Sequence, residues 1–317
     1  MIAQSLLAVL AAASVIPSNA DDRGGHGGGG IGPETKALGR KVEVLYAVIS
    51  CASHTRHHSK VRAGLRGLRE GGGSAFDADL RVLPVARPHV RYAIVVGDET
   101  VDDPIGRLDG DILRLRCGDL YEDLPEKVVI FAHAVTRLKT FENVTHVVKA
   151  DDHDSRMSPR SLHRLAVTLQ AETEPTKWDY SGPWPVVNSN APKGHQARRW
   201  HFGKVSPTSF WHDRPFEANY GAGVGGTGNW LAGGHTYVIS ARALDVICEA
   251  WPVVDDLGAL DRLRTTHIFE DLVVGNALEA RGIKPVLAHY GAECVKDGAW
   301  AQCGLACFEK HVGCEVS

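Results

Sequence analysis

The stretch THVVKADDHD, residues 145 to 154, indicates both the fold class and the place of a ligand site. Its first half is an apolar, β-branched run of strand length, and its second half holds three aspartates and a histidine. A buried strand that ends directly in ionisable side chains is typical of an α/β sheet, whose ligands bind outside the carboxyl ends of the strands. We therefore expect a strand here, followed by a site.

On both sides of this stretch, apolar runs of strand length alternate with helical patterns. The sequence predicts strands at residues 42–50, 92–97, 111–115, 145–150, 235–240 and 284–289. Helical spacing of apolar residues predicts helices around residues 61–68, 128–138, 159–169, 241–251 and 267–283. Ser158 and Ser240 precede two of these helices as N-caps. The alternation predicts an α/β fold with an open, mostly parallel sheet and helices on both faces.

The N-terminal segment has the pattern of a targeting sequence. An apolar run from Leu6 to Ile16 precedes Pro17 and small residues that end at Ala20. We interpret residues 1–20 as a cleaved signal peptide, or else a short signal anchor that would hold the chain on a membrane. Residues 21–41 are Gly-rich at their start and form a spacer. The expected location is the secretory pathway, in the Golgi lumen or outside the cell.

Cysteine usage agrees with an oxidising compartment. Four of the seven cysteines crowd the tail at residues 292–317, namely Cys294, Cys303, Cys307 and Cys314. Two disulfides are expected there, because the spacings lack the paired C-x-x-C that zinc sites usually show. Asn143 lies in the N-glycosylation sequon NVT.

Composition excludes one class of partner. The formal net charge is −3, so the chain has no positive electrostatic field that would attract a polyanion. The sequence also lacks the pattern of basic and aromatic residues that is typical of a nucleic-acid-binding groove. We therefore expect no nucleic-acid partner.

The acidic cluster at residues 151–154 has two interpretations. The first is a solvated turn in which Asp152 and Asp154 lead into the helix capped by Ser158. The second is a cation site, because adjacent carboxylates at the end of a buried strand repel one another unless a cation lies between them. Carboxylate and imidazole ligands with open positions suit Mn²⁺ or Mg²⁺ that bridges phosphates. No phosphate-binding loop follows a predicted strand, so we expect a metal-bound nucleoside diphosphate.

The segment HVVKADDHD (146–154) resembles the acidic motif K-T-D-D-D of glycosyltransferase family 31, which includes β1,3-galactosyl- and N-acetylglucosaminyltransferases and the Fringe enzymes. Further segments resemble that family's motifs in the same order: VRAGLR (61–66), DILRLRCGDLYEDLPEKV (111–128), LAGGHTYVISARAL (231–244) and FEDLVVGNALEARGI (269–283). The resemblance spans about residues 42–291. It departs at Ala150 and His153, where the family has Thr and Asp.

The resemblance implies a GT-A type, nucleotide-sugar-binding α/β domain over residues 42–291. The implied reaction moves a hexose or N-acetylhexosamine from a UDP-sugar to a hydroxyl of a glycan or glycoprotein, with inversion and a β1,3 linkage. Asp151 and Asp152 would contact the donor, and Asp151 and His153 would hold Mn²⁺ or Mg²⁺. The departure at His153 bears on which metal binds rather than on whether one binds.

Inversion requires a base that takes the proton of the acceptor hydroxyl. By resemblance to the family's E-D-V, Asp271 is the expected base, with Glu270 as its support or substitute. The alternative is that both carboxylates only favour the N-terminus of a helix.

Three further positions are candidates. Arg62 is assigned to donor binding by the resemblance alone. His289 is either a metal ligand or a hydrogen-bonded structural histidine. Gly233 and Gly234 either let the backbone approach the donor, with Trp230 stacked on a sugar, or belong to a flexible loop.

Two other functions remain open on the sequence alone. A metal-dependent hydrolase would use the same Asp and His cluster. A catalytically inactive carbohydrate-binding relative would keep the fold and lose the base, whereas Asp271 is present.

Overall fold

The computed structural model describes residues 41–69, 88–152, 157–174, 176–182, 185–186, 199, 201–216, 230–231 and 236–288. The chain divides into two compact units, residues 1–36 and 37–317, and every described residue belongs to the second. The expected signal peptide and nearly all of the Gly-rich spacer lie outside the described residues, as do the four tail cysteines.

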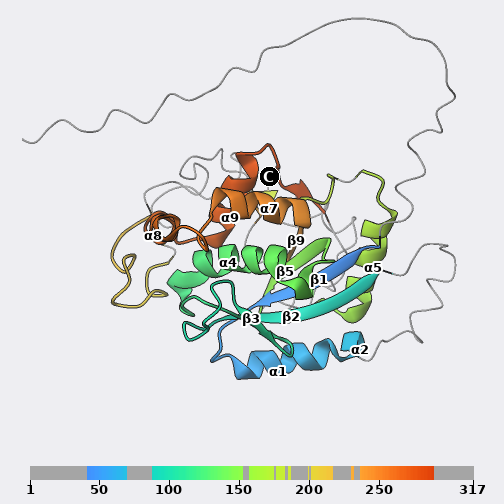
Figure 1. The fold of residues 1–317 in the computed structure, drawn as a ribbon, viewed down its shortest axis with the longest axis horizontal. Helices are drawn as coiled ribbons and strands as arrows, with labels where there is room; N and C mark the ends of the chain where they lie inside the picture. The colour runs from blue at the N-terminus through green and yellow to red at the C-terminus, as the bar shows by residue number, and fades with distance from the viewer. Residues whose placement is uncertain are drawn as a thin grey trace, which may run out of the picture. The chain divides into compact units, whose positions relative to one another are not determined.

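An eight-stranded sheet organises the described residues (Figure 1). Its strands, from one edge to the other, are β10 (Val286–Leu287), β6 (Tyr180–Gly182), β9 (Tyr237–Ser240), β5 (His146–Asp151), β1 (Glu43–Ile49), β2 (His89–Gly97), β4 (Ile112–Leu115) and β3 (Arg107–Asp109). Two further short strands, β7 (Pro185–Val186) and β8 (Trp230–Leu231), pair antiparallel with each other. The central strands β1 and β5 are the buried apolar runs expected from the sequence.

The sheet is mixed but mostly parallel, as expected, because six of its eight strands run in one direction. Strands β5, β1, β2 and β4 form a parallel centre. Strand β9 is antiparallel to both β5 and β6, and β3 is antiparallel to β4. Apolar periodicity predicts that a segment is a strand but carries no information on its direction, so the reversal of β9 and β3 could not be foreseen.

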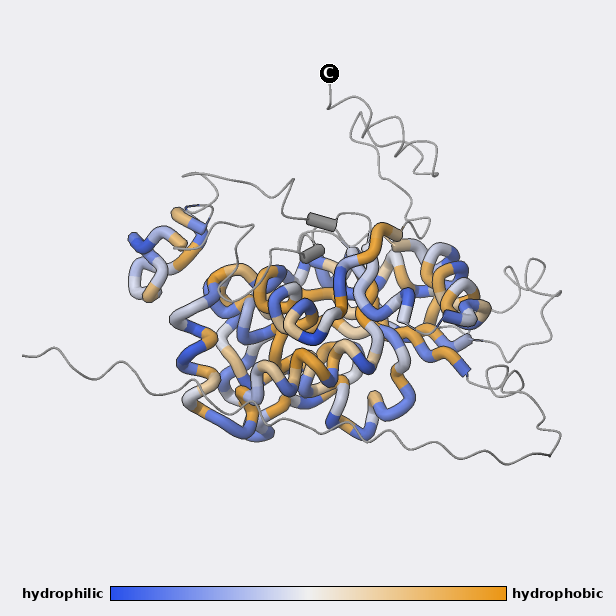
Figure 2. Tube along the Cα trace, turned by 90° about the horizontal axis from the view of Figure 1, so that it is seen from above, coloured by the Kyte–Doolittle hydropathy of each residue, from blue (hydrophilic) through white to orange (hydrophobic). Residues whose placement is uncertain are grey.

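Helices cover both faces of the sheet, as expected. Their bounds are α1 (Thr55–Gly64), α2 (Arg66–Arg69), α4 (Leu124–Arg137), α5 (Pro159–Ala171), α7 (Ala241–Ala250), α8 (Leu257–Thr266) and α9 (Glu270–Glu279), with 3-10 turns η3 (Tyr121–Asp123) and η4 (Lys139–Phe141). Alternate residues of β1 enter two separate cores: Leu45 packs with α4, α7 and α9, and Tyr46 packs with α1 and α5. Hydrophobic and hydrophilic residues are interspersed along the trace of the described residues (Figure 2). Among the described helices, none combines the length and the hydropathy needed to cross a membrane.

Local sequence signals account for several helix ends. The Ser158 hydroxyl accepts the N–H of Ser161 at 3.2 Å, and the Ser240 hydroxyl accepts that of Ala243 at 3.2 Å, so both expected N-caps are confirmed. Helix α4 ends at Arg137 because Leu138 is already extended. Helix α9 begins at Glu270 rather than at residue 267, since Phe269 is extended and buried.

Candidate functional site

Strand β5 directs the side chains of Lys149 and Asp151 toward one face of the sheet. Successive side chains of a strand point to opposite faces. Val147 belongs to the core under α4, α7 and α9, so Lys149 and Asp151 point to that same face. The N-terminus of α9 begins there with Glu270.

A buried ammonium group joins these two elements. Lys149 Nζ lies 2.6 Å from Asp151 Oδ1 and 3.3 Å from Glu270 Oε1, and the Lys149 side chain is only 2% exposed. It also lies 5.5 Å from the centre of the Tyr237 ring. Burial by itself lowers the pKa of Lys149, but the two carboxylates outweigh it and raise that pKa above its ordinary value. Lys149 is therefore a permanent cation at the end of β5.

Asp271 and Tyr121 lie beside this ion pair. Asp271 is 9% exposed, and its Oδ1 accepts the N–H of Leu272 at 2.9 Å at the start of α9. The pKa of Tyr121 is raised by burial and by the negative charges of Glu270, Asp271 and Asp151. The expected base and the expected donor-binding Asp151 therefore share one electrostatic environment with Tyr121.

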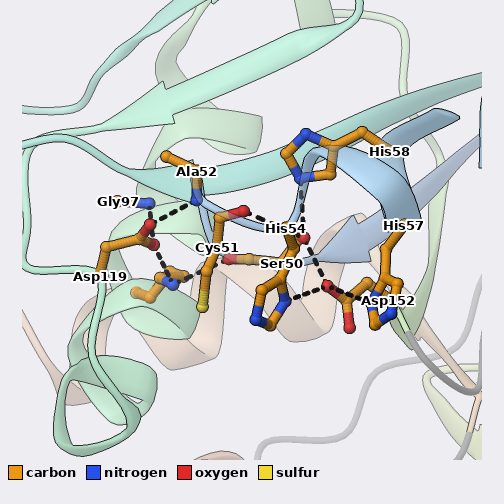
Figure 3. Close-up of polar contacts among 10 residues, drawn as sticks. Ser50, Cys51, Ala52, His54, His57, His58, Gly97, Asp119 and Asp152 are labelled. Atoms are coloured by element: carbon orange, nitrogen blue, oxygen red, sulfur yellow. Dashed lines mark hydrogen bonds and ion pairs between the residues drawn. The ribbon is translucent and has the colours of Figure 1, made fainter.

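Asp152 faces a different group of side chains. Its backbone N–H donates to the carbonyl of Ile49 at 3.1 Å, which places it beside the loop that follows β1. Its Oδ2 accepts the Ser50 hydroxyl at 2.6 Å and lies 2.7 Å from Nδ1 of His54 and 3.4 Å from Nδ1 of His57 (Figure 3). The ligand atoms of His54, His57 and Asp152 all lie within 4.8 Å of one another, close enough to hold a metal ion.

The hydroxyl of Ser50 also contacts a buried histidine. Nε2 of the buried His58 lies 2.9 Å from the Ser50 hydroxyl (Figure 3). Burial, and next the charge of Arg62, lower the pKa of His58. A neutral His58 that donates from Nε2 leaves the Ser50 hydroxyl hydrogen free to bond Asp152.

Asp119 and Lys127 hold the loops around the site in place. Asp119 accepts the backbone N–H of Gly97 at 2.8 Å and of Ala52 at 2.5 Å, and its Oδ1 lies 2.6 Å from Lys127 Nζ (Figure 3). Lys127 is fully buried and also donates to the carbonyl of Ser50 at 2.9 Å. One carboxylate and one ammonium group thus tie together the ends of β1 and β2 and the start of α4.

The structure places the sequence-predicted residues in three groups. Asp151, Glu270 and Asp271 gather near Lys149, and Asp152 lies with the histidines of the first loop. Arg62 binds Asp111 through Nε at 2.9 Å and through a terminal nitrogen at 3.0 Å, so its described contacts are with the protein. His153, His289, Gly233 and Gly234 lie outside the described residues.

Sequence reasoning missed Lys149, Ser50, His54 and His57. A usable signal was present in SHTRHH, residues 53–58, where three histidines directly follow a predicted strand. The i, i+3 spacing of His54 and His57 puts them side by side at the start of α1. Their approach to Asp152 depends on the pairing of β1 with β5, which no local pattern encodes.

Comparisons with known proteins add no relative. No protein-family model matches the chain. A search of the curated proteins also finds no match.

Proposed function

We propose that this protein is an inverting, metal-dependent glycosyltransferase of the GT-A type that uses a UDP-sugar donor. The acceptor would be a hydroxyl of a glycan or glycoprotein, and the expected linkage is β1,3. An α/β domain with a mixed sheet flanked by helices is compatible with this fold.

The convergence of two motifs carries the proposal. The motifs at residues 146–154 and 269–283 resemble the same family. The Lys149–Glu270 ion pair joins these two segments at the carboxyl end of β5. Ligands of α/β sheets bind at this edge. If both resemblances were due to chance, there would be no reason for the two segments to lie next to each other in the fold.

The residues would divide the reaction as follows. The acceptor oxygen attacks the anomeric carbon, the bond from that carbon to the UDP oxygen breaks, and Asp271 takes the acceptor proton. Asp271 is the proposed base by resemblance to the family's E-D-V, and Glu270, which pairs with Lys149, is its support. The positive charge of Lys149 holds Asp151 and Glu270 in place and offsets their repulsion.

A metal ion fits this site. Asp152 is a carboxylate with two imidazoles at ligand distance, which is a suitable donor set. A bound divalent cation such as Mn²⁺ would supply a Lewis acid for the charge that develops on the leaving diphosphate.

The test is UDP release from a panel of UDP-sugars with Mn²⁺, measured with and without simple sugar acceptors. Release that increases with acceptor, together with a new glycoside detected by mass spectrometry, is the expected result. Asp271→Asn is the control that keeps the shape of the site. A panel in which no donor yields UDP, from protein shown to be folded, would overturn the proposal.

One observation favours a second candidate. Two histidines and one carboxylate also form the ligand set of zinc hydrolases that activate water. A metal-dependent hydrolase would release free sugar or phosphate from a substrate at the same rate whether or not an acceptor is present.

A further inference from the structure

We infer that His54, His57 and Asp152 form a binding site for a divalent transition-metal ion, with Zn²⁺ bound more tightly than Mn²⁺. This ligand set differs from the one expected from the sequence, which drew on Asp151, His153 and His289. Within the described residues, Asp151 is paired with Lys149 and does not belong to the cluster.

The separations suit a metal ion. Ligand atoms around a tetrahedral ion with bonds of about 2.0 to 2.1 Å lie about 3.3 Å apart. His57 Nδ1 lies 3.4 Å from Asp152 Oδ2, and His54 Nδ1 lies 2.7 Å from the same oxygen. The His54 side chain is 45% exposed, so it has room to rotate. Its Nδ1 can then move away from Asp152 Oδ2 to the separation that a bound metal ion requires.

His57 provides an independent observation. Its Nδ1 atom is buried, and it makes no hydrogen bond. A buried polar atom without a hydrogen bond costs free energy. A metal ion between His57 and Asp152 would satisfy this nitrogen.

Asp152 is held in place without an ion. Its side chain is 7% exposed, and the Ser50 hydroxyl, itself in contact with the buried His58, binds Oδ2. Partners of this kind orient metal ligands and are worth roughly 10- to 100-fold in metal affinity. The site is therefore pre-organised at its carboxylate and adjustable at its histidines.

The donor chemistry determines the choice of ion. Imidazole nitrogen suits Zn²⁺ and its neighbours, whereas Mg²⁺ and Ca²⁺ prefer oxygen ligands. Among divalent ions of the first transition row, affinity rises from Mn²⁺ to a maximum at Cu²⁺, and Zn²⁺ binds less tightly than Cu²⁺ but more tightly than Mn²⁺.

Isothermal titration of the chelator-treated full chain with Zn²⁺, Mn²⁺ and Mg²⁺ tests the site without donor or acceptor. Failure of the glycosyltransferase proposal would therefore leave this result unaffected. We expect Zn²⁺ to bind more tightly than Mn²⁺, and Mg²⁺ to compete with neither. His57→Ala should remove one equivalent of Zn²⁺, and Ser50→Ala should weaken that equivalent by roughly 10- to 100-fold.

Controls keep the outcome unambiguous. His212→Ala removes a half-exposed histidine outside the cluster, whose Nε2 lies 3.6 Å from Asp213 Oδ1, and it should leave binding unchanged. If His57→Ala does not fold by circular dichroism, His54→Ala, at a more exposed side chain, replaces it. The inference is overturned if the folded variant, His57→Ala or its replacement His54→Ala, keeps every equivalent of Zn²⁺, or if His153→Ala alone abolishes binding.

Discussion

Lys149 and Glu270 form an ion pair of 3.3 Å between residues that lie 121 positions apart. Lys149 occupies the inward position before the acidic cluster, and Glu270 is the first residue of α9. With Asp151 on its other side, the ammonium group neutralises charge at the end of a buried strand. This pair connects the two halves of the candidate site.

Replacement of Lys149 with Met should lower the free energy of unfolding by about 3 to 5 kcal/mol, because it leaves Asp151 and Glu270 without their cation in a buried position. Urea denaturation with an unchanged slope would measure this loss. Lys177→Met is the matched control. Lys177 pairs with Glu172 at 2.8 Å but its side chain is 50% exposed, so the expected cost is within about 1 kcal/mol. Equal stability of Lys149→Met and the wild type would show that the pair is dispensable.

Asp271→Asn should lower turnover by about 10² to 10⁴-fold, because the amide keeps the shape of the side chain and removes its basicity. UDP binding by calorimetry should stay unchanged, since the proposed donor contacts, Asp151 and Asp152, are not altered and the amide keeps the shape of the Asp271 side chain. Glu270→Gln should lower turnover by a smaller factor. The roles are reversed if Glu270→Gln is inactive while Asp271→Asn turns over normally.

Gly97→Ala should destabilise the protein by about 1 to 3 kcal/mol through overpacking. A Cβ at Gly97, the last residue of β2, would lie 2.1 Å from the backbone oxygen of Gly118. Gly64→Ala is the matched control, because Gly64 lies in α1 with nothing within 4 Å of such a Cβ. It should be neutral or gain up to about 1 kcal/mol. Thermal unfolding of both variants measures the difference in stability. Similar melting temperatures would contradict the close approach of Gly97 to the backbone of Gly118.

Stability should fall in mild acid because of His267. This histidine is 3% exposed, and burial lowers its pKa from 6.5 to about 4. The unfolded chain therefore takes up the proton first, so the loss begins as the pH falls below 6.5 and is complete near pH 4. A shift of this size corresponds to on the order of 3 kcal/mol.

His267→Phe isolates this contribution from that of other buried histidines. The variant keeps a ring beside Trp251, whose centroid lies 5.2 Å from that of His267. Denaturant titrations at pH 7 and pH 4.5 should show a smaller decrease for the variant than for the wild type. An identical decrease in both would mean that His267 does not couple protonation to unfolding.

Local patterns in the sequence predicted much of the fold. The sequence predicted strands β1, β2, β4, β5, β9 and β10 and the caps at Ser158 and Ser240, because apolar periodicity and N-cap hydrogen bonds act over a few residues. Helix α8 and strands β3, β6, β7 and β8 were missed. Strand β6 is only three residues long, Tyr180–Gly182, and it lies in a region with little periodicity.

The sequence by itself determined most of the longer strands and helices, and it placed Asp151, Asp152 and Asp271 at the ends of such elements. Only the tertiary structure decided which side chains meet. Lys149 faces Glu270 because β5 turns that side chain toward α9, and Asp152 faces His54 and His57 because β5 pairs with β1. Both contacts join segments about a hundred residues apart, so they depend on strand pairing and packing that a local pattern does not specify.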